Sequence, residues 1–597
     1  MLSLFQVNHV AVQQTVLMSG GLRLEMTSDG PSYALSVDGA RWLVPHDSAT
    51  ISLRDRGPLA LQPSPRGVTQ GRDKWGQYAL VEQHWGESAD PTTSRTLLIT
   101  SVRAYEGREL LVFSQRWPLG LSTMGGSDAT TIAPYPTIAT SSAGNTTTPL
   151  NFYQWGGCQI ANSFSGKWTD ASTIPGGQRL GMPLLLYNGS GRSIVASPSR
   201  NWLTAVHEEG NGTVGIGIKA SVKSLPANFT HETIIVGGST INRTMYKLGN
   251  ALLELSGKQR VAAEDDFVLS HLGYWTDNGA FYDSSNKASG FANHEEMLKA
   301  LKMQWQKQGI PFRYVQWDDW QWVVGDRHPD IPGPYPNWLP LASAIPSGMT
   351  DWLGMPTSLY NPMYAANTSY ITSNTSYGEW AVDRGSAMGG SAVPLDAAYY
   401  RAAFRNGSRA RMQHFEQDFL CTYQWETNLT TSDVTTGMTW LHAMDDAASS
   451  FTDHEGKENA TITLQLCMMT PVYALASTEL MRVTNGRGTS DNEHNSRADL
   501  YKLGPSGLLM GAMGLLTSRD NVFTSPKEAG CAHGNCTSPD YRLENVAAVL
   551  SGGPYGEFSC IYRYISRESC SQFDSLPLTS LTISNSTRKD RAMALIF

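Results

Sequence analysis

The pattern of apolar and polar positions divides the chain into two parts. In residues 1–255, short apolar-rich segments such as 96–102 and 109–113 are separated by clusters of Gly, Pro, Asn and Ser. Short strands bounded by turn-forming residues are typical of an all-β domain, and we predict a β-sandwich here. Residues 210–215 match the pattern G-x-G-x-x-G, but they do not open a helix. We therefore interpret them as a hairpin turn and not as a nucleotide site.

From about residue 268 onward, short apolar strands alternate with amphipathic helical stretches. The clearest helix covers 293–308, where Met297, Leu298, Leu301 and Trp305 recur at helical spacing. We predict eight strands, at 272–275, 312–317, 357–360, 411–415, 462–468, 480–484, 514–517 and 546–550. Eight strands alternating with helices predict a TIM (β/α)8 barrel over residues 256–597, in an α/β fold preceded by the β-sandwich.

Polar and aromatic residues gather where these strands end, which is where a barrel places its catalytic groups. The candidates for substrate binding are Trp275 and Asp277 after the first strand, Asp318, Asp319 and Trp320 after the second, Glu416 at the fourth, Arg487 at the sixth and Asp520 after the seventh. Carboxylates can bind sugar hydroxyls and indoles can stack on a pyranose ring. Any one of them alone could instead cap a turn or fill the core.

Two carboxylates, Asp418 and Asp491, each follow an apolar β-like segment. A retaining glycosidase needs such a pair, one as nucleophile and one as acid/base, with the carboxyl groups about 5 to 7 Å apart. The pattern therefore favours a carbohydrate-active enzyme in which Asp418 attacks the sugar and Asp491 transfers the proton.

Composition excludes several other classes. The 597 residues are 41% apolar and 16% charged, with a net charge of −8 and no basic blocks, which argues against a nucleic-acid partner. No uninterrupted apolar run reaches about 18 residues, so we expect no membrane span. The HExxH and P-loop motifs are missing, and we expect no metal or organic cofactor. The sequence does not specify the oligomeric state.

Twelve Asn-x-Ser/Thr sequons favour a secretory route, which would place a glycoprotein outside the cell or in a lysosome or vacuole. They stand at Asn145, Asn188, Asn211, Asn228, Asn242, Asn367, Asn374, Asn406, Asn428, Asn459, Asn535 and Asn585. Against this, the N-terminal segment is broken by polar residues at 8, 9, 13 and 14 and makes a poor signal peptide. Either the true start lies elsewhere, or the sequons are incidental.

Seven cysteines fit the same route. Cys531 with Cys536, and Cys560 with Cys570, are spaced to close loop disulfides. Cys531, His533 and Cys536 could instead bind zinc, but no second ligand cluster follows, so we favour the disulfide. Cys467 lies in an apolar strand-like run, where it is expected to pack in the core.

The motifs LGYWTDNGAFYD, YVQWDDWQW, FEQDF and LQLCMMTPVYAL resemble, in this order, the strands of clan D glycoside hydrolases. The arrangement with a β-sandwich before the barrel is similar to family 36, which includes α-galactosidases and raffinose synthase relatives; this chain looks like a divergent member. The resemblance implies that Asp418 is the nucleophile, that Asp491, four residues after Arg487, is the acid/base, and that Asp318, Asp319 and Trp275 bind the sugar.

Two positions depart from the family pattern. Family 36 α-galactosidases usually have Lys where this chain has Glu416, and relatives often place Asp where Ser490 stands. Only about 40 residues follow the eighth predicted strand, fewer than the family's C-terminal β-domain needs, so this domain is expected to be missing or truncated.

The resulting expectation is double displacement on an α-linked galactose-type sugar. With a sugar as acceptor the same groups would make a transglycosylase of the raffinose synthase type. A carbohydrate-binding homologue without turnover, or a structural glycoprotein, are the alternatives from other classes. Retention of both Asp418 and Asp491 favours the enzyme, and Glu416 favours the binding protein.

Overall fold

The fold was obtained as a computed structural model. It describes most of residues 15–519, with larger gaps at 169–180, 277–290, 318–346 and 489–502, and three short strands beyond residue 519. The chain forms two compact units. The first comprises residues 1–259, 423–439 and 470–479, and the second comprises 260–422, 440–469 and 480–597.

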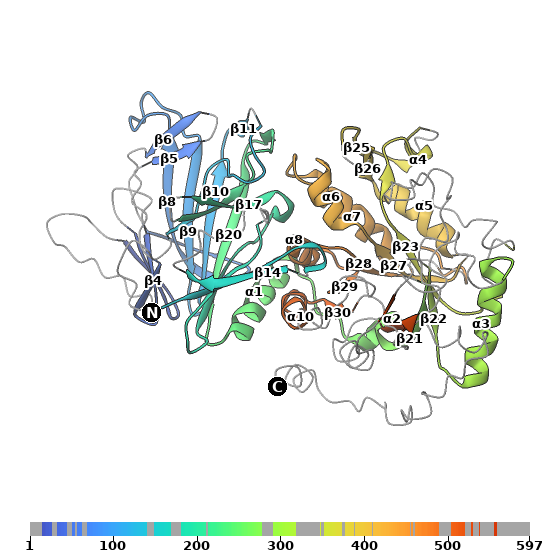
Figure 1. Ribbon diagram of the computed structural model, residues 1–597. Helices are drawn as coiled ribbons and strands as arrows, with labels where there is room; N and C mark the ends of the chain where they lie inside the picture. Colours follow the sequence, from blue (N-terminus) through green and yellow to red (C-terminus); the bar gives the residue numbers. More distant parts are fainter. Residues whose placement is uncertain are drawn as a thin grey trace. The chain divides into compact units, whose positions relative to one another are not determined.

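The first unit consists mainly of antiparallel sheets (Figure 1). A four-stranded sheet has the order β1-β2-β3-β4, with β1 Thr15–Ser19, β2 Leu22–Met26, β3 Tyr33–Val37 and β4 Ala40–Leu43. An 11-stranded sheet contains β5 Thr50–Leu53, β6 Gly57–Leu61, β7 Thr69–Asp73, β8 Gly76–Gly86, β9 Leu98–Tyr105, β10 Leu110–Trp117, β13 Asn151–Gly156, β14 Asn162–Lys167, β15 Leu184–Tyr187, β16 Ser193–Pro198 and β20 Phe229–Gly238. Smaller sheets join β12 Thr137–Ala139, β18 Thr213–Ile218 and β17 Ala205–Gly210, and β11 Leu121–Ser122 with β19 Ser224–Leu225.

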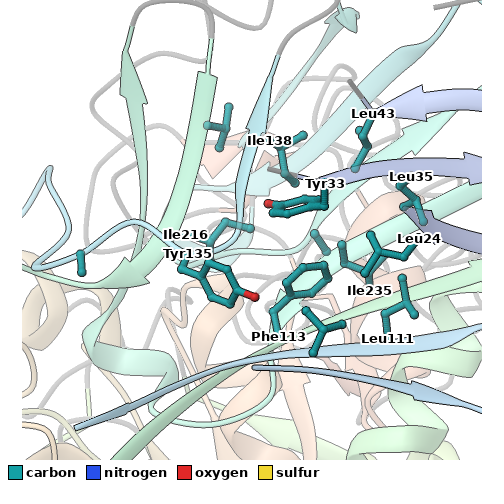
Figure 2. Close-up of a cluster of buried hydrophobic side chains, with 14 of the residues drawn as sticks. Leu24, Tyr33, Leu35, Leu43, Leu111, Phe113, Tyr135, Ile138, Ile216 and Ile235 are labelled. Atoms are coloured by element: carbon teal, nitrogen blue, oxygen red, sulfur yellow. The ribbon is translucent and has the colours of Figure 1, made fainter. Parts of the chain in front are cut away.

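Alternation of buried and solvent-facing side chains builds the core of this unit. In β2, for example, every second residue is buried, and Leu24 joins a cluster with Phe113 of β10 and Ile216 of β18 (Figure 2). One apolar core therefore binds three of the sheets together. The segment 210–215 lies in the β17–β18 hairpin, in which Gly210 pairs with Thr213, so the hairpin prediction is confirmed.

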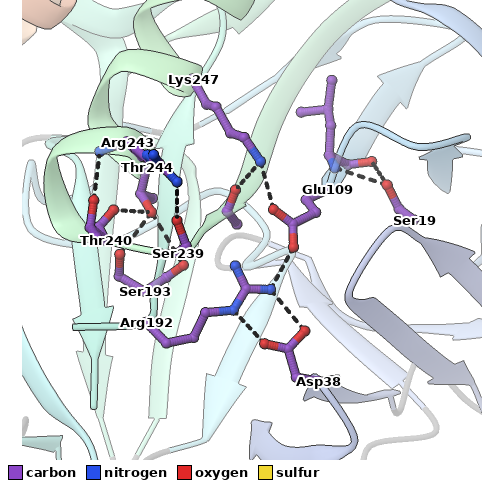
Figure 3. Close-up of polar contacts among 12 residues, drawn as sticks. Ser19, Asp38, Glu109, Arg192, Ser193, Ser239, Thr240, Arg243, Thr244 and Lys247 are labelled. Atoms are coloured by element: carbon purple, nitrogen blue, oxygen red, sulfur yellow. Dashed lines mark hydrogen bonds and ion pairs between the residues drawn. The ribbon is translucent and has the colours of Figure 1, made fainter. Parts of the chain in front are cut away.

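Helix α1 (Ile241–Ser256) is tied to the sheets by charged groups (Figure 3). Thr240 accepts a hydrogen bond from the Arg243 amide at its N-terminus, and Gly257 ends it at φ 80°. Lys247 donates to the Glu109 carboxylate over 2.6 Å, and Arg192 bonds both Glu109 and Asp38. The network connects α1 with turns of three different strand pairs.

The second unit contains an eight-stranded parallel sheet in the order β30-β29-β28-β27-β23-β22-β21-β33. Its strands are β21 Leu272–Trp275, β22 Tyr314–Trp317, β23 Thr357–Asn361, β27 Met412–Gln417, β28 Thr463–Leu466, β29 Val483–Arg487, β30 Leu516–Ser518 and β33 Tyr555–Glu557. Seven lie at or close to predicted positions. The predicted strand 546–550 falls outside the described residues, and β33 pairs with β21 in the eighth place.

Side chains show that this sheet curls strongly. The Arg487 guanidinium on β29 lies 4.0 Å from the centre of the Trp275 ring on β21, although five strand spacings separate them in the sheet order. Five spacings of about 4.8 Å would hold them roughly 24 Å apart in a flat sheet. The sheet therefore wraps around its concave face. Among the described residues the edge strands β30 and β33 are not paired, so the predicted closed barrel is seen only as this curled sheet.

Helices cover the outer face of the curled sheet. Helix α5 (Ala397–Ser408) packs on β27, where its Phe404 meets the Phe415 ring at 5.0 Å, and α10 (Leu503–Ala512) packs on β30. Phe415 thus points outward, and its neighbour Glu416 points to the concave face. Further helices of the chain are α2 Phe267–Ser270, α3 His294–Gln308, α4 Ser369–Thr372, α6 Leu420–Glu426, α7 Thr436–Ser449 and α8 Pro471–Ala476, of which α8 belongs to the first unit.

The predicted helix at 293–308 is confirmed as α3. Asn293 accepts a hydrogen bond from the Glu296 amide at its N-terminus, and Gly309 ends it at φ 71°. After β23 the chain adds a small antiparallel sheet of β24 Tyr364–Ala365, β26 Ser391–Pro394 and β25 Trp380–Asp383. A short hairpin, β31 Lys527–Glu528 with β32 Cys536–Thr537, lies beyond β30.

Two further features bear on the sequence expectations. Cys158 and Cys421 are each disulfide-bonded, which the close cysteine spacings did not indicate. The predicted loop disulfides, and the alternative zinc ligands Cys531 and His533, fall outside the described residues. None of the described helices has the length and apolar character that crossing a membrane requires.

Candidate active site

Asp418 lies directly after the last residue of β27, at the carboxyl end of a central strand of the curled sheet. Its side chain is 7% exposed. The Tyr360 hydroxyl donates to one carboxylate oxygen over 2.7 Å, and the Phe419 backbone amide donates to the other over 2.6 Å. The Cys467 thiol, at the end of the next strand, is hydrogen-bonded to the same carboxyl group. Asp418 is therefore held in one orientation by three neighbours.

The protonation of Asp418 is shifted toward neutral pH. Burial, and next the negative charge of Glu416, raise the pKa of this carboxyl to about 7, against the opposing effect of the hydrogen bonds from Tyr360, Cys467 and Phe419. A carboxyl group that titrates near neutrality can change its charge under working conditions, as nucleophiles and proton donors in active sites do.

Just before Asp418 on the same strand face, Glu416 forms a buried ion pair with Arg487, at 3.1 Å between Oε1 and Nε. Two amides complete its shell: Gln465 donates to Oε1 over 2.7 Å and Gln316 donates to Oε2 over 3.2 Å. The Arg487 guanidinium also lies on the Trp275 ring. We call these five residues, from five strands, the Glu416 layer.

Two residues further back on β27, His414 lies in a second polar group. Its Nδ1 is 2.7 Å from the Ser358 hydroxyl, and its Nε2 is 3.1 Å from Asn485 Nδ2. Because the amide nitrogen can only donate, Nε2 accepts and the proton lies on Nδ1. Burial lowers the pKa of His414, which keeps the ring neutral. The concave face is thus polar at two levels below Asp418.

Unusual backbone conformations mark the ends of two neighbouring strands. Phe419, directly after Asp418, has φ 58°, and Met468, directly after Cys467, has φ 46°. Residues other than glycine rarely adopt this left-handed region, because it costs about 1–2 kcal/mol for each such residue. Such strain tends to occur at functional sites, where it aims a particular side chain. Here the two strained residues turn the chain immediately after Asp418 and Cys467, whose side chains are hydrogen-bonded to each other.

The structure brings four of the residues predicted for the site to the concave face: Asp418, Glu416, Arg487 and Trp275. The others, Asp277, Asp318, Asp319, Trp320, Asp491 and Asp520, lie outside the described residues. The distance between the two predicted catalytic carboxylates therefore stays a prediction.

The sequence did not predict several residues of this site, namely Tyr360, Gln316, Gln465 and His414, nor the hydrogen bond between Cys467 and Asp418. A signal for them was present. In strands flanked by helices, both faces are expected to be apolar, yet Ser358 and Tyr360, or His414 and Glu416, place polar groups at every second position. This period of two indicates a polar concave face.

A hollow of about 510 Å³ lies elsewhere, in the first unit, bordered by Asp73, Arg103, Arg200 and Glu232. Its charges satisfy one another: Arg103 bonds Asp73 over 2.7 Å and also Glu232, and Arg200 is 3.7 Å from Glu232. We assign it no role. Among the described residues, no group of three or more His, Cys, Asp or Glu side chains is placed to hold a metal ion.

Solved structures with a similar fold are glycoside hydrolases. The family 36 α-galactosidase AgaA of Geobacillus stearothermophilus, with bound raffinose, is 11% identical, with a TM-score of 0.52 over 98% of this chain and 85% of its own. A family 97 enzyme of Pseudoalteromonas sp. strain K8, with acarbose, is 10% identical, with a TM-score of 0.52 over 93% and 83%. The α-N-acetylgalactosaminidase NagBb of Bifidobacterium bifidum, with GalNAc, is 12% identical, with a TM-score of 0.50 over 90% and 93%.

No protein-family model and no curated protein matches the chain. At such low identities the likeness is one of fold. The chain shares the fold of family 36 and family 97 glycoside hydrolases.

Proposed function

We propose that this protein is a retaining glycoside hydrolase acting on α-linked galactose-type sugars, with Asp418 as nucleophile and Asp491 as acid/base. The observation that carries the proposal is the setting of Asp418. It is a buried carboxyl group at the carboxyl end of a central parallel strand, oriented by Tyr360 and by the Phe419 amide. The fold shared with α-galactosidases supports the same assignment.

In this mechanism the ionised Asp418 attacks the anomeric carbon while Asp491 protonates the departing oxygen. Water, deprotonated by Asp491, then opens the glycosyl-enzyme intermediate. The hydrogen bonds from Tyr360 and Phe419 fix the direction of the carboxylate, so its attacking oxygen is preorganised. They also favour the charged form that attack requires.

The test is release of nitrophenol from a panel of α- and β-linked nitrophenyl glycosides. We expect turnover of an α-galactoside or α-N-acetylgalactosaminide, and a loss of about a thousandfold or more in Asp418→Asn. Asp453→Asn is the matched control, because the Asp453 carboxylate accepts hydrogen bonds from two backbone amides in an exposed turn of the same unit. Equal turnover by Asp418→Asn and wild type would reject the assignment.

Asp491 needs a separate experiment. In Asp491→Ala, azide can attack the glycosyl-enzyme in place of water, because an anionic nucleophile needs no deprotonation, and it should restore turnover with a glycosyl azide of retained configuration as the product. If no glycoside is turned over by the wild type although sugars bind, the protein is the carbohydrate-binding homologue. Products extended by an acceptor sugar, in place of free galactose, would make it a transglycosylase.

We further infer passage through the secretory pathway. The sequon residues Asn228, Asn242, Asn367, Asn406 and Asn428 are exposed. Exposed acceptors are accessible to glycosylation. Protein made in a eukaryotic secretory host should therefore lose mass on treatment with peptide N-glycosidase, whereas an unchanged mass would count against this route.

A further inference from the structure

Glu416 was expected to bind the sugar, but its acceptor positions are occupied by protein groups. Oε1 accepts from Gln465 and from Arg487 Nε, and Oε2 accepts from Gln316 over 3.2 Å and from Arg487 Nη2 over 3.4 Å. An ionised carboxylate has about four lone-pair sites, so four donors fill it. Glu416 is 1% exposed. A sugar hydroxyl could bind it only by displacing one of these donors.

Arg487 is held as firmly as its partner. It is 0% exposed, its guanidinium edge faces Glu416 and its flat face lies on the Trp275 ring at 4.0 Å. The Trp275 indole N–H in turn donates to the Tyr314 hydroxyl over 3.1 Å. The charged members of the Glu416 layer are thus engaged with one another.

The layer has a fixed relation to Asp418. Glu416 lies in β27 and Asp418 directly follows this strand, two positions further along the chain, so both side chains project to the concave face. Among the residues that the structure describes, the other groups that face Asp418 are the Tyr360 hydroxyl from β23, the Cys467 thiol directly after β28 and the Phe419 amide, all of which favour its charged form. Glu416 is the negative charge that opposes them.

We propose that Glu416 is a positioning residue and not a sugar ligand: it anchors Arg487 against Trp275 and places a negative charge next to Asp418. The proposal rests on the proposed role of Asp418 as nucleophile. In the family that the sequence resembles, a Lys at this position would act in the opposite direction. With Glu416 in its place, the negative charge adds to the effect of burial in raising the pKa of Asp418.

Glu416→Gln tests the proposal in the intact protein. The pH profile of kcat/KM reports the protonation of the free enzyme. We expect its acid limb to move down by about one pH unit, since a neighbouring like charge is removed, while KM stays within about threefold. A KM increase of tenfold or more with an unmoved acid limb would overturn the proposal, because this is the result expected of a lost sugar contact.

A second readout does not depend on turnover. In protein labelled with ¹³C at the aspartate carboxyl, the Asp418 signal is the one that Asp418→Asn removes. It should titrate at lower pH in Glu416→Gln than in wild type, and Gln465→Met, which removes an amide donor but no charge, should not lower it. If no glycoside is hydrolysed by any variant, the proposed function fails while this titration still decides the role of Glu416.

Glu416→Gln leaves a buried guanidinium without its counter-ion and risks misfolding. The double variant Glu416→Gln/Arg487→Gln removes both charges and avoids this. A lowered titration of Asp418 in either folded variant supports the proposal, and an unchanged titration in a folded variant overturns it.

Discussion

The Tyr360 hydroxyl, on β23, donates a hydrogen bond of 2.7 Å to the carboxylate of Asp418, which follows the neighbouring strand β27. Tyr360 lies in register with Glu416, two residues before Asp418. The same carboxyl group is thus stabilised in its charged form by one neighbour and destabilised by another, and its chemistry depends on the balance between them.

Removal of the tyrosine hydroxyl should shift this balance. A hydrogen bond to a charged group contributes about 1.5–3 kcal/mol, which corresponds to roughly one to two pH units. In Tyr360→Phe we expect the pKa of Asp418 to rise and the acid limb of kcat/KM to move to higher pH by about one unit or more. Tyr400→Phe is the control, because the Tyr400 hydroxyl contacts Trp440 in the same unit. An acid limb that shifts equally in both variants would contradict the assignment.

Asp418 is also expected to reduce stability at neutral and alkaline pH. Its folded pKa, about 7, lies above the usual 3.8. A raised carboxyl pKa contributes stability below the unfolded pKa, and this contribution is lost as the pH rises from about 4 to about 7. Asp418→Asn should therefore increase the free energy of unfolding by about 1–4 kcal/mol at pH 8, and by less at pH 5. Urea unfolding at both pH values checks the sign; a variant less stable than wild type at pH 8 would be evidence against a destabilising carboxylate.

The Tyr314 ring leaves no room for a side chain at Gly273. A Cβ added at this position would lie 2.2 Å from the Tyr314 ring, whose hydroxyl accepts a hydrogen bond from the Trp275 indole N–H. We expect Gly273→Ala to cost about 1–3 kcal/mol of stability and to lower activity, because displacement of Tyr314 disturbs Trp275 and Arg487. Gly504→Ala is the matched control: no described residue has an atom within 4 Å of the Cβ that would be added, and alanine favours helix α10. Thermal unfolding and kcat/KM of both variants measure the difference.

Two buried histidines should make the first unit sensitive to acid. Burial lowers the pKa of His207 to about 4, and burial together with the neighbouring His207 lowers the pKa of His231 to about 3, both from 6.5. As the pH falls, the unfolded chain protonates these histidines at a higher pH than the folded chain does. The free energy of unfolding is therefore at its full value above about pH 6.5 and falls below it, by up to about 1.4 kcal/mol per pH unit for each ring.

Hydrogen exchange of peptides from β17 and β20 at pH 7 and pH 5 measures this loss. His231→Gln should roughly halve the pH dependence, because one of the two titrating rings is removed. If the variant keeps the full pH dependence, the buried histidines are not its source.

The sequence by itself determined the order of elements. Period-two segments gave the antiparallel part, and period-3.6 segments after short apolar runs gave the parallel part, because side-chain periodicity follows from local backbone geometry. The sixth strand was expected at 480–484 but is Val483–Arg487. The backbone amides of Met481 and Arg482 donate to the Asp445 carboxylate over 2.8 and 2.6 Å, so these amides are not available for hydrogen bonds within the sheet. No local sequence pattern predicts this contact.

The sequence also placed Asp418, Glu416, Arg487 and Trp275 near strand ends. Only the tertiary structure decided what each of them contacts. Arg487 contacts Trp275 because the sheet curls, and the carboxylate oxygens of Glu416 accept hydrogen bonds from residues of three other strands. The pKa of Asp418 depends on burial and on a charge held nearby, and both are properties of packing. Residue type and spacing thus identify the chemical groups, whereas their exposure, partners and charge state arise from contacts between segments far apart in the chain.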